Sequence, residues 1–114
     1  MADTVFHKII RKEIPAEILH EDEVCIIIKD IQPVSPHHYL AIPKKSISSL
    51  AHVTEADAQI LGHVLVVASD FAKKKNVSQT GYRLVINCGK DGGQTVDQLH
   101  VHILAGREHS WPPG

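Results

Sequence analysis

The chain has 114 residues, 43% of them hydrophobic, and a formal net charge of −1 at pH 7. This length suits one domain with its own core, and the balanced charge argues against nucleic acids and anionic membranes as partners. No apolar run approaches the roughly 20 residues needed to span a bilayer, and the start lacks the basic and apolar regions of a signal peptide. We therefore expect one cytoplasmic domain over residues 1–114, of which residues 1–5 are mobile.

Cysteine and histidine usage narrows the compartment and the chemistry. Cys25 and Cys88 each lie in an apolar or strand-like stretch. We predict free, buried thiols in a reducing compartment, although the sequence leaves a pairing open. Nine histidines are unusual in so short a chain. Four are predicted to be surface residues, namely His7, His20, His52 and His63, whereas the others of interest are clustered at His37–His38 and at His100 and His102. Of the clustered residues, His38, His100 and His102 are candidates for a site, and His37 is predicted to be a surface neighbour of it.

The first third of the chain predicts a short helix and two strands. The helix is expected over Phe6–Arg11, ahead of a proline. Val24–Ile28 is an apolar, β-branched run typical of a buried strand. Polar and proline residues over Asp30–Pro36 indicate a loop, after which Tyr39–Ile42 is a second strand that Pro43 ends.

A long helix is predicted from Thr54. Thr54 and Asp57 have capping-box spacing, with Asp in place of the usual Glu. An apolar stripe then recurs at helical spacing over residues 60–72 and indicates core, or core plus a dimer surface. Lys73–Lys75 complement the negative end of the helix dipole, an interpretation favoured over a nucleic-acid patch, and Asn76 suits a left-handed stop.

The last third of the chain predicts two more strands around a glycine-rich loop. Thr80–Gly81 forms a turn before a strand over Tyr82–Asn87. The polar loop Gly89–Thr95 leads into a strand over Gln98–Leu104, and a tail covers residues 107–114. Together these elements indicate an α+β domain, a mainly antiparallel sheet with a long helix laid on it.

Two histidines on the last predicted strand form the strongest candidate site. Successive side chains of a strand point to opposite faces, so Gln98, His100 and His102 share one face, with neighbours about 7 Å apart. The other face, which suits packing under the long helix, carries Leu99, Val101 and Ile103. Upstream, glycines let backbone amides approach a phosphate, and Thr95 adds a hydroxyl. A neutral imidazole at His100 beside such an oxyanion cradle is suited to phosphoryl transfer.

Other interpretations of the same residues remain open. His100 and His102 could lie on a solvated sheet face, or could ligate zinc with His38 as a third ligand. The glycine-rich loop could be a plain hairpin connection, and Asp30 could be a turn residue. The end Trp111–Gly114 could be an ordered tail or a proline-rich ligand segment.

Several stretches of the sequence resemble the Hint branch of the histidine-triad (HIT) nucleotide-binding family. They are Phe6–Pro15, Asp30–Ile31, Pro36–Lys44, Gly92–Arg107 and Trp111–Gly114, so the similarity runs nearly end to end. The resemblance implies a HIT-like fold with a five-stranded sheet, one long helix and one short N-terminal helix. It also implies a homodimer whose sheet is continuous across the interface, and a reaction that needs no metal or cofactor. The ligands implied are purine nucleoside monophosphates or their phosphoramidate or acyl-phosphate derivatives, with hydrolysis of adenosine 5′-phosphoramidate as the type of reaction.

The resemblance also assigns roles to individual residues. His100 aligns with the nucleophile that becomes transiently nucleotidylated, His102 with the histidine that contacts the phosphate and leaving group, and His38 with a supporting histidine. Asp30 aligns with the carboxylate that holds the ribose hydroxyls. The other aligned positions line the base pocket (Phe6, Ile9, Ile28 and Ile31), contact the phosphate (Asn87, Gly93 and Thr95) or complete the partner subunit's site (Trp111).

The family pattern has one departure here, because the first triad histidine is replaced by Gln98. Gln98 is still expected among the nucleotide-binding residues, and its main-chain carbonyl can orient His100 whatever the side chain. We predict that activity survives, because the nucleophile and the oxyanion donors, Thr95 among them, are retained. The alternative is a weakened network around His100, which would leave a slow enzyme or a nucleotide-binding regulatory module.

Overall fold

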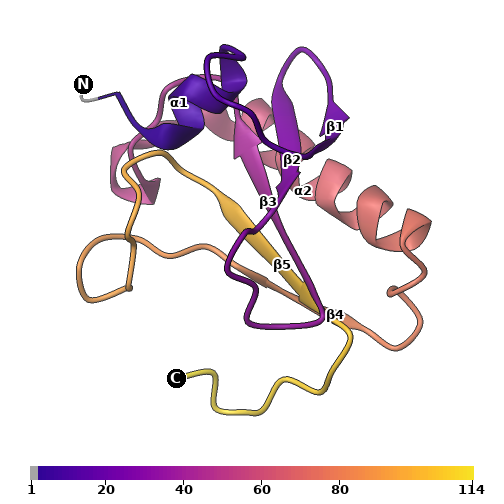
Figure 1. Ribbon diagram of the computed structural model, residues 1–114. Coiled ribbons are helices and arrows are strands. Elements are labelled where there is room, and N and C mark those ends of the chain that lie inside the picture. Colours follow the sequence, from indigo (N-terminus) through magenta and orange to yellow (C-terminus); the bar gives the residue numbers. More distant parts are fainter. Residues whose placement is uncertain (1–2) are drawn as a thin grey trace.

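One antiparallel sheet organises the chain, and a helix lies on each of its faces (Figure 1). The computed structural model describes residues 3–114. Its elements are α1 (Val5–Ile10), β1 (Ile18–Glu21), β2 (Cys25–Lys29), β3 (His37–Pro43), α2 (Ala58–Lys74), β4 (Tyr82–Val85) and β5 (Val101–Ala105), with 3-10 turns at Leu50–His52 and Glu55–Asp57. The strand order is β1-β2-β3-β5-β4. The predicted fold class, five antiparallel strands with one long and one short helix, is confirmed.

The two faces of the sheet carry separate cores. Successive residues of β2 point to opposite faces. Ile27 packs with Val64 and Phe71 of α2, whereas Ile28 packs with Phe6 of α1. Because both faces of β2 and β3 are covered, their central residues, Cys25–Ile28 and Tyr39–Ile42, are apolar runs with no polar alternation.

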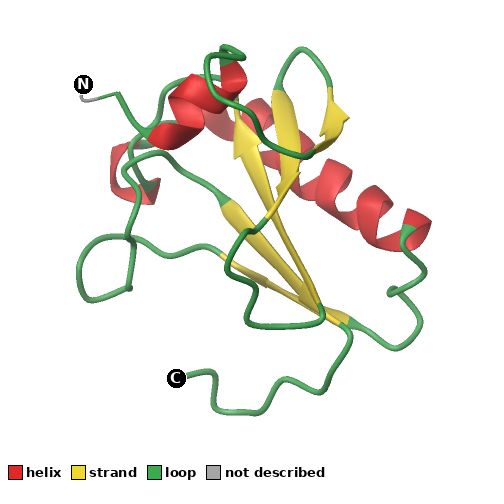
Figure 2. Cartoon of the chain, viewed as in Figure 1, coloured by secondary structure: helices red, strands yellow, loops and turns green. Residues whose placement is uncertain are grey.

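The strand β5 begins later than predicted. A strand was expected from Gln98, but β5 starts at Val101. Residues 98–100 leave the ladder, because the Gln98 side chain turns inward and bonds the chain around residues 43–47. Val101 and Ile103 still pack in the core under α2, as expected from the alternation. Figure 2 shows that the long connection from β4 to β5 is loop.

The edge strand β1 has no counterpart among the strands predicted from local pattern. Its four residues are half-buried or exposed, and its pairing with β2 is irregular between Ile18 and His20. So short and exposed a segment lacks the alternation that marks a strand. Its conformation follows from pairing with β2, which is a tertiary effect.

Local signals placed the ends of α2 well. The capping box of Thr54 and Asp57 is confirmed, although residues 55–57 form a 3-10 turn and α2 itself begins at Ala58. Asn76 has a φ of 61°, so the predicted left-handed stop is also confirmed. The strand predicted over Tyr82–Asn87 is shorter, because β4 ends at Val85.

The two cysteines and the N-terminal residues were also predicted from the sequence. Cys25 and Cys88 are free as predicted, but only Cys25 is buried, while Cys88 is half-buried. Of the segment 1–5 that was expected to be mobile, residues 1–2 lie outside the described residues, and Thr4 caps α1 through its side chain. Within residues 3–114, no helix is long and apolar enough to cross a membrane.

Candidate functional site

A pocket of about 830 Å³ opens on the α1 side of the sheet. This volume is typical of a site for a small-molecule ligand. Its walls come from α1 and the segment after it, the end of β2 and the loop beyond, and the approach to β5. Among the lining residues are eight that were predicted for the site: Phe6, Ile9, Ile28, Asp30, Ile31, Thr95, His100 and His102. The fold therefore brings apolar side chains, a carboxylate and two imidazoles to one cavity.

His100 is held in one orientation and one tautomer at the pocket wall. Its ring is buried and meets the ring of Phe6 edge-on, with 5.0 Å between the ring centroids. Nδ1 lies 2.7 Å from the main-chain oxygen of Gln98. A carbonyl oxygen can only accept a hydrogen bond, so Nδ1 carries the proton and Nε2 keeps its lone pair. Nε2 is therefore free to attack an electrophilic atom in the cavity.

Gln98 itself is fully buried and anchors the strand approach to its neighbours. Its Nε2 donates to the carbonyl oxygens of Pro43 (3.0 Å) and Lys45 (2.8 Å), and its Oε1 accepts from the backbone N–H of Ile47 (3.0 Å). The two N–H groups of the amide thus meet two carbonyl oxygens, and its oxygen meets a backbone N–H, a match that the primary amide provides. The amide is fully used inside the protein and has no group left for a nucleotide. Nucleotide contact by the main chain of Gln98 stays a prediction. What Gln98 offers the site is its main-chain oxygen.

His7 belongs to the same buried network, contrary to its predicted place on the surface. It is 9% exposed, because its ring turns under α1 towards Gln98. The Thr4 N–H donates to His7 Nδ1 over 2.9 Å, so Nε2 carries the proton. That N–H lies 3.0 Å from Ser46 Oγ and 3.2 Å from Gln98 Oε1. The sequence signal for this burial was the capping position of His7, three residues after Thr4.

His102, at the pocket wall, forms a hydrogen-bonded pair with His38, which is outside the lining. The backbone N–H of Val34 donates to His38 Nδ1 over 3.1 Å, which leaves the proton of His38 on Nε2. His38 Nε2 lies 2.9 Å from His102 Nδ1 and 3.3 Å from Oδ2 of Asp30. His102 accepts at Nδ1, so its own proton sits on Nε2, the ring nitrogen left for the pocket. This pairing puts a hydrogen-bond donor next to the nucleophilic nitrogen of His100, whose ring centroid is 5.0 Å away.

Burial keeps both members of this pair neutral. Desolvation, followed by the neighbouring rings of His100 and His38, lowers the pKa of His102 to about 4, against a smaller opposing effect of Asp30. Desolvation also lowers the pKa of His38, again opposed by Asp30. At neutral pH His102 therefore acts as a neutral N–H donor, and not as a cation.

These lowered values predict a pH dependence of stability. The unfolded chain protonates His102 near its ordinary pKa of 6.5, whereas the folded chain resists protonation down to a pKa of about 4. The unfolded state then binds more protons over this window, so the free energy of unfolding should fall as the pH decreases from about 6.5 to about 4. Urea unfolding at stepped pH measures this, and His102→Gln should flatten the slope. The same change at exposed His52 should leave the slope as it is; equal slopes in all three proteins would contradict the assignment.

The glycine-rich loop reaches the pocket only through its last residues. Thr95 and Val96 line the cavity. Asn87 and Gly93, which were predicted to contact phosphate, are outside the lining of the described pocket, and Nδ2 of Asn87 donates to the Gly92 carbonyl over 2.6 Å. A side chain at Gly92 would collide with the backbone of residue 88, so the tight turn requires glycine. Phosphate contact by Asn87 and Gly93 stays a prediction.

Part of the pocket wall, mostly apolar, was not predicted from the sequence. The additional lining residues are Val5, Ile14, Pro15, Ala16, Glu17, Lys29, Pro33, Leu40 and Val96. Leu40 pairs with Ile28 across β2 and β3, so it shares the pocket face of the sheet. A signal for Leu40 was present in the sequence, but it depended on a register that only the folded sheet defines.

The tail and two other histidines lie away from this cavity. Trp111 is 82% exposed, and residues 107–114 are absent from the lining of the pocket within the described chain. Arg83 donates to the carbonyl oxygens of His109 and Ser110, which ties the tail to β4. His37 contacts the hydroxyl of Tyr39, away from the histidine pair.

Asp30, His38 and His102 also have the donor atoms to hold a metal. One ligand atom of each lies within 4.8 Å of the others. The hydrogen bond between the neutral rings of His38 and His102 accounts for the contact of these two residues without an ion. Independence from metal, as the sequence predicts, stays a prediction that a chelator can test.

Comparisons with known proteins agree with this geometry. Residues 3–111 match the family described as scavenger mRNA decapping enzyme C-term binding. Uncharacterized HIT-like proteins of Synechocystis sp. and Synechococcus elongatus are 50% and 47% identical over 112 residues, covering 98% of this chain and 97% of each relative. The crystal structure of a HIT family hydrolase from Legionella pneumophila is 42% identical, with a TM-score of 0.95 over 96% of this chain and 98% of that one. The chain belongs to the HIT-like family.

Proposed function

We propose that the protein is a purine nucleoside phosphoramidate hydrolase of the Hint branch, acting through a transient nucleotidyl-histidine at His100. The observation that carries this proposal is the bond from His100 Nδ1 to the Gln98 carbonyl, which leaves Nε2 unprotonated at the wall of a nucleotide-sized cavity. The similarity to a HIT family hydrolase of Legionella pneumophila supports hydrolysis as the reaction class.

The proposed reaction has two displacements at phosphorus. His100 Nε2 attacks the α-phosphorus of adenosine 5′-phosphoramidate and the P–N bond breaks, so the nitrogen takes up a proton and leaves as ammonia. His102 keeps its proton and donates a hydrogen bond through Nε2–H to the leaving nitrogen or to a phosphoryl oxygen, a role consistent with its neutral state. The proton that the nitrogen takes up comes from solvent. Water then attacks the nucleotidyl-histidine, releasing AMP and restoring the neutral imidazole.

The remaining lining supports a nucleoside as the ligand. Phe6, Ile9 and Ile28 provide an apolar surface on which a purine base can lie. Asp30 stands at the same wall, where its carboxylate can accept from the two ribose hydroxyls. Apolar contacts of this kind make no hydrogen bonds to the polar edge of the base. They favour purines over pyrimidines because of the larger ring area, and we expect similar affinities for adenine and guanine nucleotides.

A homodimer is part of this proposal. The strand β4 is an edge of the sheet, and α2 carries exposed Leu65 and Val66. Pairing two copies along such an edge would hide unpaired backbone groups and apolar side chains. The exposed Trp111, remote from its own pocket, would then be free to complete the partner's site, the role implied by the family resemblance.

Intact-protein mass spectrometry tests the proposed function. Mixing the protein with adenosine 5′-phosphoramidate and quenching early should reveal a protein species heavier by one adenylyl group (AMP less one water), and peptide mapping should locate the adduct on His100. AMP and ammonia should appear in equal amounts at steady state. Because no step uses a metal, excess EDTA should leave the rate unchanged.

The alternative function predicts a different set of results. A nucleotide-binding or regulatory module would bind AMP tightly, yet would form no adduct and release no ammonia. That combination, in protein shown to be folded, would reject the hydrolase and favour the regulatory module. Inhibition by EDTA with recovery on adding Zn²⁺, in protein that circular dichroism shows to stay folded without the metal, would instead assign the chemistry to a metal at Asp30, His38 and His102.

A further inference from the structure

A second cluster of metal-ligating side chains lies at the turn between β1 and β2, on the α2 side of the sheet. His20 Nε2 and His63 Nε2 each lie 2.8 Å from the same carboxylate oxygen, Oδ2 of Asp22. The thiol of Cys25 is 3.7 Å from that oxygen. The donor atoms of His20, Asp22 and Cys25 all fall within 4.8 Å of one another. Residues from β1, the turn, β2 and α2 therefore converge on one point.

The surrounding structure fixes Asp22 and leaves its second oxygen for the cluster. Oδ1 accepts from the backbone N–H groups of Val24 (2.7 Å) and Cys25 (2.9 Å), which makes the turn rigid. Although burial alone would raise it, hydrogen bonds from His20 and His63 hold the pKa of Asp22 below its usual range. The ionised Oδ2 accepts from two N–H groups and one S–H group. Each of these hydrogens is on a nitrogen or sulfur atom that can ligate a metal.

We propose that Asp22, His20, His63 and Cys25 form a binding site for a single Zn²⁺-class transition-metal ion. Two imidazoles, a carboxylate and a thiolate are four ligands of the types that Zn²⁺ takes in a tetrahedral site. Zn–ligand bonds of about 2.0 to 2.3 Å set the ligand atoms of a tetrahedral site roughly 3.3 Å or more apart. The two imidazole nitrogens, each 2.8 Å from Oδ2 of Asp22, therefore move slightly away from that oxygen when the ion enters between them. The site is unconnected with the hydrolase proposal, because it lies on the opposite face of the sheet from the pocket.

The charges and protons of this site balance. Each histidine moves its proton from Nε2 to Nδ1 and ligates through Nε2, a tautomer shift that releases no proton. Burial and the nearby Asp22 raise the pKa of the Cys25 thiol to about 12, so the free thiol is protonated and metal binding releases one proton. A thiolate and a carboxylate then offset the two positive charges of the ion. A site closed by four protein ligands is structural, and here it would tie the edge hairpin to α2.

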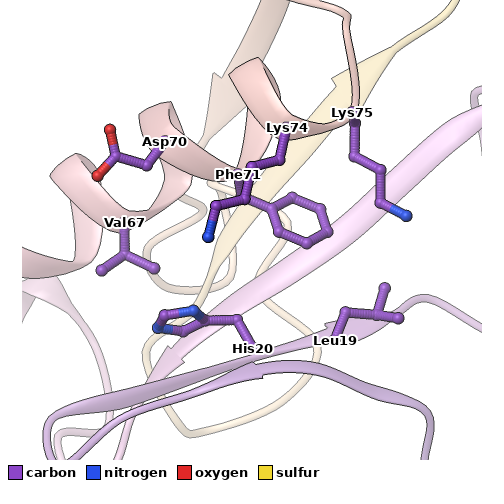
Figure 3. Close-up of a pocket in the computed structure, with 7 residues that line it drawn as sticks. All are labelled: Leu19, His20, Val67, Asp70, Phe71, Lys74 and Lys75. Atoms are coloured by element: carbon purple, nitrogen blue, oxygen red, sulfur yellow. The ribbon is translucent and has the colours of Figure 1, made fainter.

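The ion has a path to the cluster. His20 borders a hollow of about 320 Å³ between β1 and α2, and Figure 3 shows its ring lying below Val67, between the strand and the helix. Both His20 and Asp22 side chains are 28% exposed, and that of His63 is 40% exposed. Only Cys25 is fully buried, beneath the other three.

Cobalt and zinc titrations of the chelator-stripped protein test this site. One equivalent of Co²⁺ should produce a thiolate-to-cobalt charge-transfer band in the near ultraviolet, which Zn²⁺ should abolish by displacement. Cys25→Ser should remove the band, and His63→Asn, on the helix surface, should weaken Zn²⁺ affinity at least about tenfold. Zn²⁺ should also raise the melting temperature of the wild type, and His63→Asn should reduce that rise.

Two controls separate this site from the histidines of the pocket. His52→Asn removes an exposed histidine outside the cluster, and His102→Asn removes a donor of the other candidate group; both should keep the band and the affinity. Folding of Cys25→Ser is checked by circular dichroism, and if that variant is unfolded, His20→Asn and His63→Asn decide the question. The proposal is overturned by the absence of a charge-transfer band at excess Co²⁺, by unchanged affinity in both histidine variants, or by binding lost only in His102→Asn.

Discussion

The His100→Ala variant should hydrolyse adenosine 5′-phosphoramidate slower than the wild type by several orders of magnitude, roughly 10⁴-fold to 10⁶-fold in kcat. The proposed route has no second nucleophile, because His102 carries its free proton on Nε2 and its lone pair is committed to His38. Removing His100 leaves water to attack directly, with only the pocket to orient the substrate. Single-turnover release of AMP measures the loss, and the AMP adduct should vanish with it.

A comparison with other histidine variants makes this result specific. His102→Ala should cost less than His100→Ala, since it removes a hydrogen-bond donor and leaves the nucleophile in place. His52→Ala, at an exposed position outside the pocket, should turn over like the wild type. AMP should still bind to His100→Ala, which shows that the pocket persists. Turnover by His100→Ala at the wild-type rate would reject His100 as the nucleophile.

The Gln98→Met variant should lose about 3 kcal/mol or more of its free energy of unfolding. Methionine keeps the length of the side chain but has no amide, so the carbonyl oxygens of Pro43 and Lys45 and the N–H of Ile47 lose their buried partner. Each buried polar group left without a hydrogen bond costs roughly 1–3 kcal/mol. Equilibrium unfolding in urea, followed by circular dichroism, measures the difference.

Gln59 provides the matched control for this change. It is exposed on α2, so Gln59→Met alters the same atoms without removing a buried bond and should shift stability by less than about 0.5 kcal/mol. A second readout connects stability to the site: the ¹⁵N shifts of the His100 ring should report a mixture of tautomers in Gln98→Met if the carbonyl at position 98 loses its fixed direction. Equal stability of the two variants would show that the buried amide contributes little.

Features that depend on neighbours in sequence were predictable, and those that depend on packing were not. The capping box at Thr54 and Asp57 and the left-handed Asn76 are local preferences of a few residues, and the structure has both. The edge strand β1 escaped prediction because its half-exposed residues carry no periodic signal. Pairing with β2 decides its conformation, and no window of local sequence contains that partner.

Within the site, His100 and His102 are neighbours, as strand alternation predicts, but for a different physical reason. His100 and His102 do meet at one cavity, but His100 precedes β5 and owes its direction to the Gln98 carbonyl, not to the pleat of a strand. Strand alternation also predicted that the Gln98 side chain shares the face of His100 and His102, where a polar side chain would contact the ligand. A primary amide can equally satisfy three backbone groups in the interior, and residue type alone does not separate the two.

Main-chain atoms set which ring nitrogens of the pocket histidines carry hydrogen. The N–H of Val34 sets which nitrogen of His38 bears hydrogen, and through it the state of His102, while the Gln98 carbonyl does the same for His100. Val34 is 62% exposed, so its side chain can drift in evolution without disturbing this arrangement. Only proline, which lacks an N–H, would remove this hydrogen bond to His38. Sequence conservation at residue 34 is therefore a poor guide to its importance, since the contribution comes from an atom that nineteen of the twenty amino acids share.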